Sequence, residues 1–387
     1  MKGMIFLKTE ETAGTKDSAY LFLPGEILSE GDTIKEINRL KETDLTQEEK
    51  ERYILPGLVD IHTHGCMGAD FCDSVKAEGD AVLETICAYE TSVGVTSLCP
   101  TTMTYDEARL TAIMQKARDF THGNHPLKQA VAGVHLEGPF ISREKCGAQN
   151  PEYIQKPDLA MLERLQEASG GLVRLVAIAP ETDGAIDCIR KGSAFRFSIA
   201  HTTADYETAS RAIAAGAKHV THMYNAMPPF LNRAPSVVGA AFDDKDTFVE
   251  LIGDGIHVHP SVVRATFSMF GAKRVVLISD SMEATGKPDG TYALGGQEVF
   301  KKGNLATLAD GTLAGSVTNL FDCMKSVIAM GVPQEAAIRA ATINPARSVG
   351  IDGLVGSLDT GKRADILVCD KALNLQRVIA SGVERKG

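Results

Sequence analysis

Short β-branched runs alternate with longer helical patterns through the middle of the 387-residue chain, and this alternation predicts an α/β protein. Eight such runs occur, and strands separated by helices pair in parallel through right-handed crossovers. The two ends of the chain carry strand-like pieces without intervening helices. We therefore predict a (β/α)8 TIM-type barrel with a small β-sandwich domain built from both chain ends.

The eight candidate strands lie between residues 58 and 281. In chain order they are 58–64 (LVDIHTH), 95–101 (VTSLCPT), 131–137 (VAGVHLE), 174–179 (RLVAIA), 195–202 (FRFSIAHT), 219–226 (HVTHMYNA), 249–258 (VELIGDGIHV) and 274–281 (RVVLISDS). Helix-like stretches between them include 78–89, 106–120, 159–168 and 206–215, and two more at 317–330 and 334–341 follow the eighth strand. We expect the barrel to occupy residues 55–352.

The flanking segments 1–54 and 353–387 differ from the middle of the chain in their pattern. They carry strand-like pieces at 4–8 (MIFLK), 19–23 (AYLFL), 364–370 (ADILVCD) and 375–381 (LQRVIAS), separated by turns that contain glycine. Two independent tails are the alternative, but ADILVCD alternates too regularly for a disordered tail. We expect one composite β domain.

Composition excludes several classes of partner. The chain has 50 acidic and 40 basic residues, a net charge of -10, and no basic cluster that would neutralise a run of phosphates, so nucleic acid is not expected to bind. No apolar stretch approaches the roughly 18 residues of a membrane span. The eight cysteines show no C-x-x-C spacing, which predicts reduced thiols and a cytoplasmic protein.

Metal-ligating side chains recur at the ends of the predicted strands. They are His62 and His64 on the first strand, Glu137 on the third, His201 on the fifth, His222 on the sixth and Asp280 on the eighth. Each residue alone is also typical of a structural role, but the C-terminal strand ends of such a barrel form one rim, which brings all six together. Imidazole with carboxylate is the ligand set of zinc or iron(II), of which zinc is favoured, with a position left open for water.

Six motifs identify a family. PGLVDIHTHG, GVHLEGPFIS, IAHTTAD, THMYNAMPP, LISDSMEATG and LAGS occur in this order, and PGLVDIHTHG alone indicates an amidohydrolase. With HLEGPF and THMYNAM, the chain from about residue 50 onward resembles the N-acetylglucosamine-6-phosphate deacetylase family of the amidohydrolase superfamily. Glu137 stands where hydantoinases and dihydroorotases have a carboxylated lysine. The family fold agrees with the barrel and composite β domain predicted above.

The resemblance implies how the ligands divide. Glu137, His201 and His222 hold the main metal, and His62 with His64 can hold a second one that shares Glu137, with Asp280 left open as a further shared ligand. Family members that have replaced both residues of the H-x-H work with one metal, so one or two metals per subunit are expected here.

The resemblance also implies the substrate contacts, which lie in the rim loops. They are Asn225, the Ala226 backbone, Arg233, the segment from Asp254 to His257, and the Leu313, Ala314 and Gly315 loop, with Ala148 in the loop that closes over the substrate. Gln149 departs from the family, which has a histidine there that helps to polarise the acetyl carbonyl. A glutamine amide still donates a hydrogen bond, so carbonyl polarisation is its candidate role.

We predict metal-assisted hydrolysis of the N-acetyl group of N-acetyl-D-glucosamine 6-phosphate to glucosamine 6-phosphate and acetate, in amino-sugar catabolism. Asp280 acts as general base and then as general acid, and Arg233 suits the phosphate. The galactosamine epimer is the nearest alternative substrate. A cyclic amidase or deaminase of the same superfamily, or a non-catalytic scaffold, is a more distant alternative. The resemblance further implies a homodimer.

Overall fold

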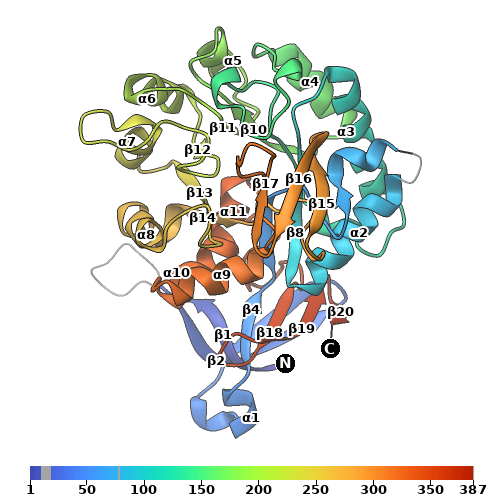
Figure 1. Cartoon of the computed structure of the whole chain (residues 1–387). Helices are drawn as coiled ribbons and strands as arrows, with labels where there is room; N and C mark the ends of the chain where they lie inside the picture. The colour runs from blue at the N-terminus through green and yellow to red at the C-terminus, as the bar shows by residue number, and fades with distance from the viewer. Residues whose placement is uncertain (10–18, 77–78, 387) are drawn as a thin grey trace.

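The computed structural model describes residues 1–9, 19–76 and 79–386, and its centre is a closed parallel barrel (Figure 1). Eight strands pair in the order β14-β13-β12-β11-β10-β9-β8-β5, and Thr63 bridges Ser281 in parallel where the two edge strands meet. The strands are β5 (Leu58–Thr63), β8 (Val95–Thr102), β9 (Val134–Leu136), β10 (Val173–Ile178), β11 (Phe197–Ile199), β12 (His219–Val220), β13 (Phe248–Ile252) and β14 (Val275–Ile278). The predicted eight-stranded α/β barrel is confirmed.

Helices surround the barrel (Figure 1). They are α2 (Gly79–Ser92), α3 (Glu107–His122), α4 (Leu159–Ala168), α5 (Ala185–Lys191), α6 (Tyr206–Ala215), α7 (Ser236–Asp243), α8 (Pro260–Arg274), α9 (Leu320–Ala329), α10 (Gln334–Ala341) and α11 (Ile343–Ser348). The predicted ranges of α4, α6 and α10 agree with the structure. Asp106 was placed inside the second helix but is its N-cap, because its side chain accepts the Arg109 N–H. Residue 78, the predicted start of the first helix, lies outside the described residues.

Four predicted strands were too long by three or more residues at their C-terminal ends, including the eighth, which ends at Ile278 as β14. β11 ends at Ile199, β12 at Val220 and β13 at Ile252, so the residues that follow belong to rim loops. His201 and His222 have φ values of 42° and 27°, which a strand cannot contain. After β13, Asp254 accepts the N–H groups of Ile256 and His257 and turns the chain.

Both chain ends contribute to a seven-stranded mixed sheet below the barrel in Figure 1. Its order is β20 (Val383–Lys386), β19 (Leu375–Ala380), β18 (Ile366–Cys369), β4 (Tyr53–Pro56), β1 (Lys2–Lys8), β2 (Tyr20–Glu30) and β3 (Thr33–Arg39), and the short α1 (Gln47–Lys50) precedes β4. β4 pairs parallel with β1 and antiparallel with β18, which joins the two ends of the chain. The exact domain boundaries stay a prediction.

A third sheet, which the sequence analysis did not predict, follows the last barrel strand. It consists of β15 (Gly290–Leu294), β16 (Gln297–Lys302) and β17 (Leu305–Thr307), drawn in orange in Figure 1. The Gln297 side chain donates a 2.6 Å hydrogen bond to the Ala148 carbonyl. This sheet therefore lies against the loop in which a substrate contact was predicted. A two-stranded hairpin, β6 (Gly65–Cys66) and β7 (Ala69–Asp70), follows β5.

Two predictions from composition can be compared with the structure. All eight cysteines lie within the described residues and none forms a disulfide, as predicted. Within the described ranges, no helix has the length and apolar character needed to cross a bilayer.

Candidate metal centre

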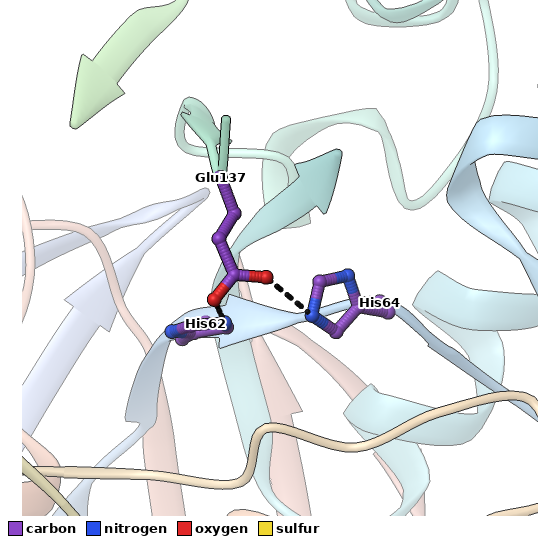
Figure 2. Close-up of side chains that lie close together, drawn as sticks. All are labelled: His62, His64 and Glu137. Carbon is purple, nitrogen blue, oxygen red and sulfur yellow. Dashed lines mark ion pairs between the residues drawn. The ribbon is translucent and has the colours of Figure 1, made fainter. Parts of the chain in front are cut away.

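Glu137, which follows β9, is the centre of the predicted cluster and is buried with 3% of its surface exposed. Its Oε1 lies 3.1 Å from Nε2 of His201 and 3.0 Å from Nε2 of His222. The other carboxylate oxygen lies 3.2 Å from Nε2 of His64, and Oε1 is 3.4 Å from Nε2 of His62. Figure 2 shows His62 and His64 pointing at this carboxylate from the end of β5. The structure thus brings all five predicted ligands together.

Asp280 completes the cluster on the side of β5. Its Oδ1 lies 3.4 Å from Nε2 of His64 and 3.5 Å from Nε2 of His62. Its backbone is fixed at both ends, because its N–H donates to the His62 carbonyl at 2.9 Å and its carbonyl accepts the Ser316 N–H at 2.7 Å. Asp280 is therefore positioned beside the histidines, where a general base or a metal ligand is needed.

Three of these residues adopt a backbone conformation that is unfavourable for residues other than glycine. His201, His222 and Asp280 have φ values of 42°, 27° and 50°. Such conformations cost on the order of 1–3 kcal/mol each and persist where the surroundings fix them. The His201 carbonyl accepts the Ser142 N–H at 2.8 Å, and the His222 N–H donates to Glu250 at 3.1 Å. Strained backbone at three strand ends is typical of a functional site.

The donor atoms fit a divalent metal. Nε2 of His201 and Nε2 of His222 are 3.1 Å apart and both face one oxygen of Glu137. Ligand atoms around a tetrahedral zinc ion at 2.0–2.1 Å stand about 3.3 Å from each other. Nε2 of His62 is buried without a hydrogen-bond partner among the described residues. Two ligand sets result, which share Glu137: His62 with His64, and His201 with His222.

The carboxylates of Glu137 and Asp280 favour a positive charge between them and the neighbouring histidines. Burial lowers the pKa of His64, but hydrogen bonds to Asp280 and Glu137 outweigh it and raise that pKa to about 9. Burial raises the pKa of Asp280, yet the nearby His62 and His64 bring it down to about 2. A metal cation takes the place of such protons when it binds, because the ligands must be deprotonated.

Acceptors behind three rings fix which imidazole nitrogen faces Glu137. Nδ1 of His201 lies 2.8 Å from the Lys145 carbonyl, and Nδ1 of His64 lies 3.2 Å from the Thr101 carbonyl. Nδ1 of His62 lies 3.0 Å from Oε2 of Glu250. Because carbonyls and carboxylates only accept, each Nδ1 carries the proton and each Nε2 is free to bind a metal. The sequence analysis missed Glu250, although a carboxylate inside the apolar run FVELI was a signal.

A cavity of about 350 Å³ opens above the cluster, within the size range of small-molecule sites. Its lining includes Asp280, Gln149 and six of the predicted substrate contacts, Ala148, Asn225, Ala226, His257, Leu313 and Gly315. Lys145, Leu294 and Thr312 also line it and were not predicted. Leu294 ends β15, so the unpredicted sheet forms part of the wall.

The other three predicted substrate contacts, all within the described residues, do not line this cavity. Ala314 is fully buried, and Asp254 supports the wall indirectly, since its Oδ2 lies 2.7 Å from Nδ1 of His257. Although burial lowers the pKa of His257, this carboxylate raises it overall. Arg233 is exposed in the loop after His222 and contributes nothing to the cavity wall of its own chain.

Gln149 has two partners at the cavity floor. Its Nε2 donates to Oε2 of Glu137 at 2.7 Å, and its Oε1 accepts the Thr104 N–H at 2.7 Å. The amide therefore orients Glu137. Carbonyl polarisation by Gln149 stays a prediction.

Comparison with known proteins identifies the family of this chain. The Amidohydrolase family profile matches residues 53–385. The chain belongs to the amidohydrolase family. It is 36% identical over 340 residues to N-acetylglucosamine-6-phosphate deacetylase of Bacillus subtilis (strain 168), covering 86% of this chain and 85% of that protein. It is 35% identical over 338 residues to N-acetylgalactosamine-6-phosphate deacetylase of Escherichia coli O157:H7, covering 87% and 88%.

A solved structure extends the likeness to the fold of the whole chain. It is a mutant N-acetyl-D-glucosamine-6-phosphate deacetylase from Mycobacterium smegmatis in complex with N-acetyl-D-glucosamine-6-phosphate, with a TM-score of 0.86, 30% identity and 100% coverage of both chains. Within the amidohydrolase family, the chain is thus an enzyme of the amino-sugar-phosphate deacetylase group.

Proposed function

We propose that the chain hydrolyses the N-acetyl group of N-acetyl-D-glucosamine 6-phosphate to glucosamine 6-phosphate and acetate. The observation that carries the proposal is the shared carboxylate of Glu137, which joins two histidine pairs below a cavity that also contains Asp280. The relatives named above act on N-acetylated hexosamine 6-phosphates according to their names, and one binds such a sugar.

The chain's own residues divide the work at the metal centre. A divalent metal, zinc in our proposal, supplies polarisation of the acetyl carbonyl and activation of water when it is bound. Glu137, His201 and His222 would hold the main metal, and His62 with His64 would hold a second metal, where one binds, that shares Glu137. Asp280 accepts the proton of the attacking water and then donates a proton to the departing amine, because its carboxylate faces the cavity beside His64.

Cationic and polar side chains at the cavity wall support binding of a phosphorylated sugar. Lys145 and His257 line the cavity, and Asn225 and the Ala226 backbone lie beside His222. Because Arg233 is exposed and outside its own cavity, we propose that it reaches the phosphate in the cavity of a partner subunit in a homodimer. Charge-assisted hydrogen bonds to phosphate from such groups give both affinity and selection.

N-Acetyl-D-galactosamine 6-phosphate is the second candidate substrate. It is supported by the 35% identity to the Escherichia coli enzyme that carries this name, which nearly equals the 36% identity to the Bacillus subtilis enzyme. The two sugars differ in the configuration of one hydroxyl group.

Acetate release from the two N-acetylated 6-phosphates and the two unphosphorylated sugars tests the proposal. The glucosamine 6-phosphate derivative should have the highest kcat/KM, with metal content of the same sample determined in parallel. Preference for the galactosamine epimer would reassign the substrate. Turnover that is equal with and without phosphate would contradict a phosphate site, and no acetate from any of the four with metal present would overturn the proposed reaction.

A further inference from the structure

Glu250 lies in the middle of β13, is fully buried, and contacts both halves of the candidate metal centre. Its Oε2 lies 3.0 Å from Nδ1 of His62. His62 lies in β5, the first strand of the barrel in chain order. The same oxygen accepts the backbone N–H of His222 at 3.1 Å. One carboxylate oxygen thus joins a ligand ring of one metal set to the backbone of a ligand in the other.

The contact with His62 determines how that ring presents itself. An ionised carboxylate only accepts, so the shared proton stays on Nδ1 and the lone pair of Nε2 is directed at Glu137 and Asp280. Nε2 of His62 is 3.4 Å from Glu137 and 3.5 Å from Asp280. Without an acceptor at Nδ1, the ring is free to take the other tautomer or to rotate, and either change removes the metal-binding lone pair.

The contact with His222 stabilises a strained backbone. His222 has a φ of 27°, and its N–H points at Glu250 and not into a strand ladder. A buried N–H that loses its acceptor is costly, so this hydrogen bond favours the conformation that directs the His222 ring at Glu137.

Direct ligation of a metal is the alternative role for Glu250. His62, His135 and Glu250 are close enough to form a set of metal ligands of their own, and the His62 and His135 ring centroids are 4.6 Å apart. Both nitrogens of His135 are buried without a hydrogen-bond partner among the described residues. Because Nδ1 of His62 already faces the Glu250 carboxylate, the geometry favours a hydrogen bond there over an additional ion.

We propose that Glu250 is a positioning residue of the metal centre, which fixes the ring of His62 and the backbone of His222 through a single carboxylate oxygen. The proposal rests on the metal centre of the proposed function but not on which sugar is hydrolysed. Loss of Glu250 should weaken the His62 and His64 metal site most, because there the ligand ring itself loses its acceptor.

Titration of the full-length metal-free protein with Zn²⁺ in competition with a chelator tests the proposal without substrate. Glu250→Leu should weaken the second, lower-affinity equivalent of Zn²⁺ by about 100-fold, at the upper end of the range for residues that orient metal ligands. Glu250→Gln keeps an acceptor but loses the charge, so its loss should be smaller, about 10-fold. The absorption spectrum of the Co²⁺-loaded protein should change for the same equivalent.

Glu90→Gln is the matched control, because Glu90 is a second fully buried carboxylate but lies on α2 outside the barrel sheet. It should leave both Zn²⁺ affinities unchanged. Wild-type affinities in a folded Glu250→Leu protein would overturn the proposal, and if that variant does not fold, wild-type affinities in Glu250→Gln would do so. Three equivalents of metal in the wild type, with one lost in Glu250→Gln, would show instead that Glu250 is itself a ligand. Failure of the wild type to bind any metal would overturn the metal centre itself.

Discussion

The two halves of the metal centre are built on different kinds of backbone. His62 and His64 sit at the end of β5, and their spacing of two residues places both on one side of an extended strand (Figure 2). His201 and His222 follow β11 and β12 in loops with positive φ, and each needs a separate hydrogen bond to hold its backbone. The backbone of the strand pair is aligned by strand register, whereas the backbone of the loop pair depends on hydrogen bonds to distant residues.

This difference continues into the cavity. His201, His222 and His64 line it, but His62 is fully buried below Glu137 and does not. The loop pair therefore faces the substrate side, and the deepest ligand belongs to the strand pair. We expect the loop pair to hold the metal that takes part in the reaction and the strand pair to be more dependent on the ring orientation of His62.

The largest expected effect is a loss of kcat on substitution of Asp280. This substitution separates a role in catalysis from a role in metal binding. Asp280→Asn should lower kcat by about 10² to 10⁴-fold, because an amide of the same shape cannot accept the proton of water. The number of metals bound should not change. Elemental analysis and kinetics on one sample measure both. A variant that keeps half of the wild-type kcat would refute Asp280 as the base, and a loss of one metal would show that it is a ligand of the strand pair.

The ligands of both halves were predictable from the sequence for a physical reason. Buried β-branched runs have a recognisable pattern, and barrel strands end on one rim, so His62, His64 and Glu137 could be placed together with His201 and His222 without coordinates. The hairpins of β15–β17 also left a signal that was not used. Gly295-Gly296 and Gly303-Asn304 are two-residue turns between short alternating runs, and both Gly295 and Gly296 have positive φ.

The residues that orient the histidines, and the exposure of Arg233, could not be predicted from the sequence. Glu250, Thr101 and the Lys145 carbonyl act on histidines that are distant in sequence, and no local pattern connects such pairs. The exposed position of Arg233 is equally invisible, because periodicity gives no information on a loop without regular structure.

The second-largest effect is expected at Arg233, which lies in the loop after His222. Arg233→Ala should lower kcat/KM for the 6-phosphate by roughly 10² to 10³-fold and leave the poor hydrolysis of the unphosphorylated sugar nearly unchanged. Arg211→Ala, an exposed arginine on α6, is the control. If Arg233 acts in a partner's cavity, mixing Arg233→Ala with Asp280→Asn protein should restore part of the activity. An equal fall on both substrates would indicate a role in the fold or metal site.

A smaller effect is expected at Gln149, which contacts the carboxylate that both halves share. Gln149→Met should weaken Zn²⁺ binding by about 10-fold, because Glu137 loses a 2.7 Å hydrogen bond that orients it. Gln166→Met, which removes a glutamine from α4 away from the cluster, is the control and should leave the affinity unchanged. An unchanged affinity in Gln149→Met together with a lower kcat would favour the alternative role in carbonyl polarisation.

The smallest expected change is the loss of one bound metal ion, and it tests the comparison of the two halves most directly. The double substitution of His62 and His64 by Ala should reduce the metal content at saturation from two ions per subunit to one, because the loop pair and Glu137 still offer two imidazoles and a carboxylate. His219→Ala removes another buried barrel histidine, whose Nδ1 lies 3.0 Å from the Ser198 hydroxyl, and should leave two ions in place. The corresponding double substitution of His201 and His222 should likewise leave one ion per subunit, held by the strand pair and Glu137. Two ions retained after loss of His62 and His64 would show that the strand pair does not hold metal. The rings of these histidines would then serve to support Glu137 and Asp280, and the two halves would differ in function as well as in backbone.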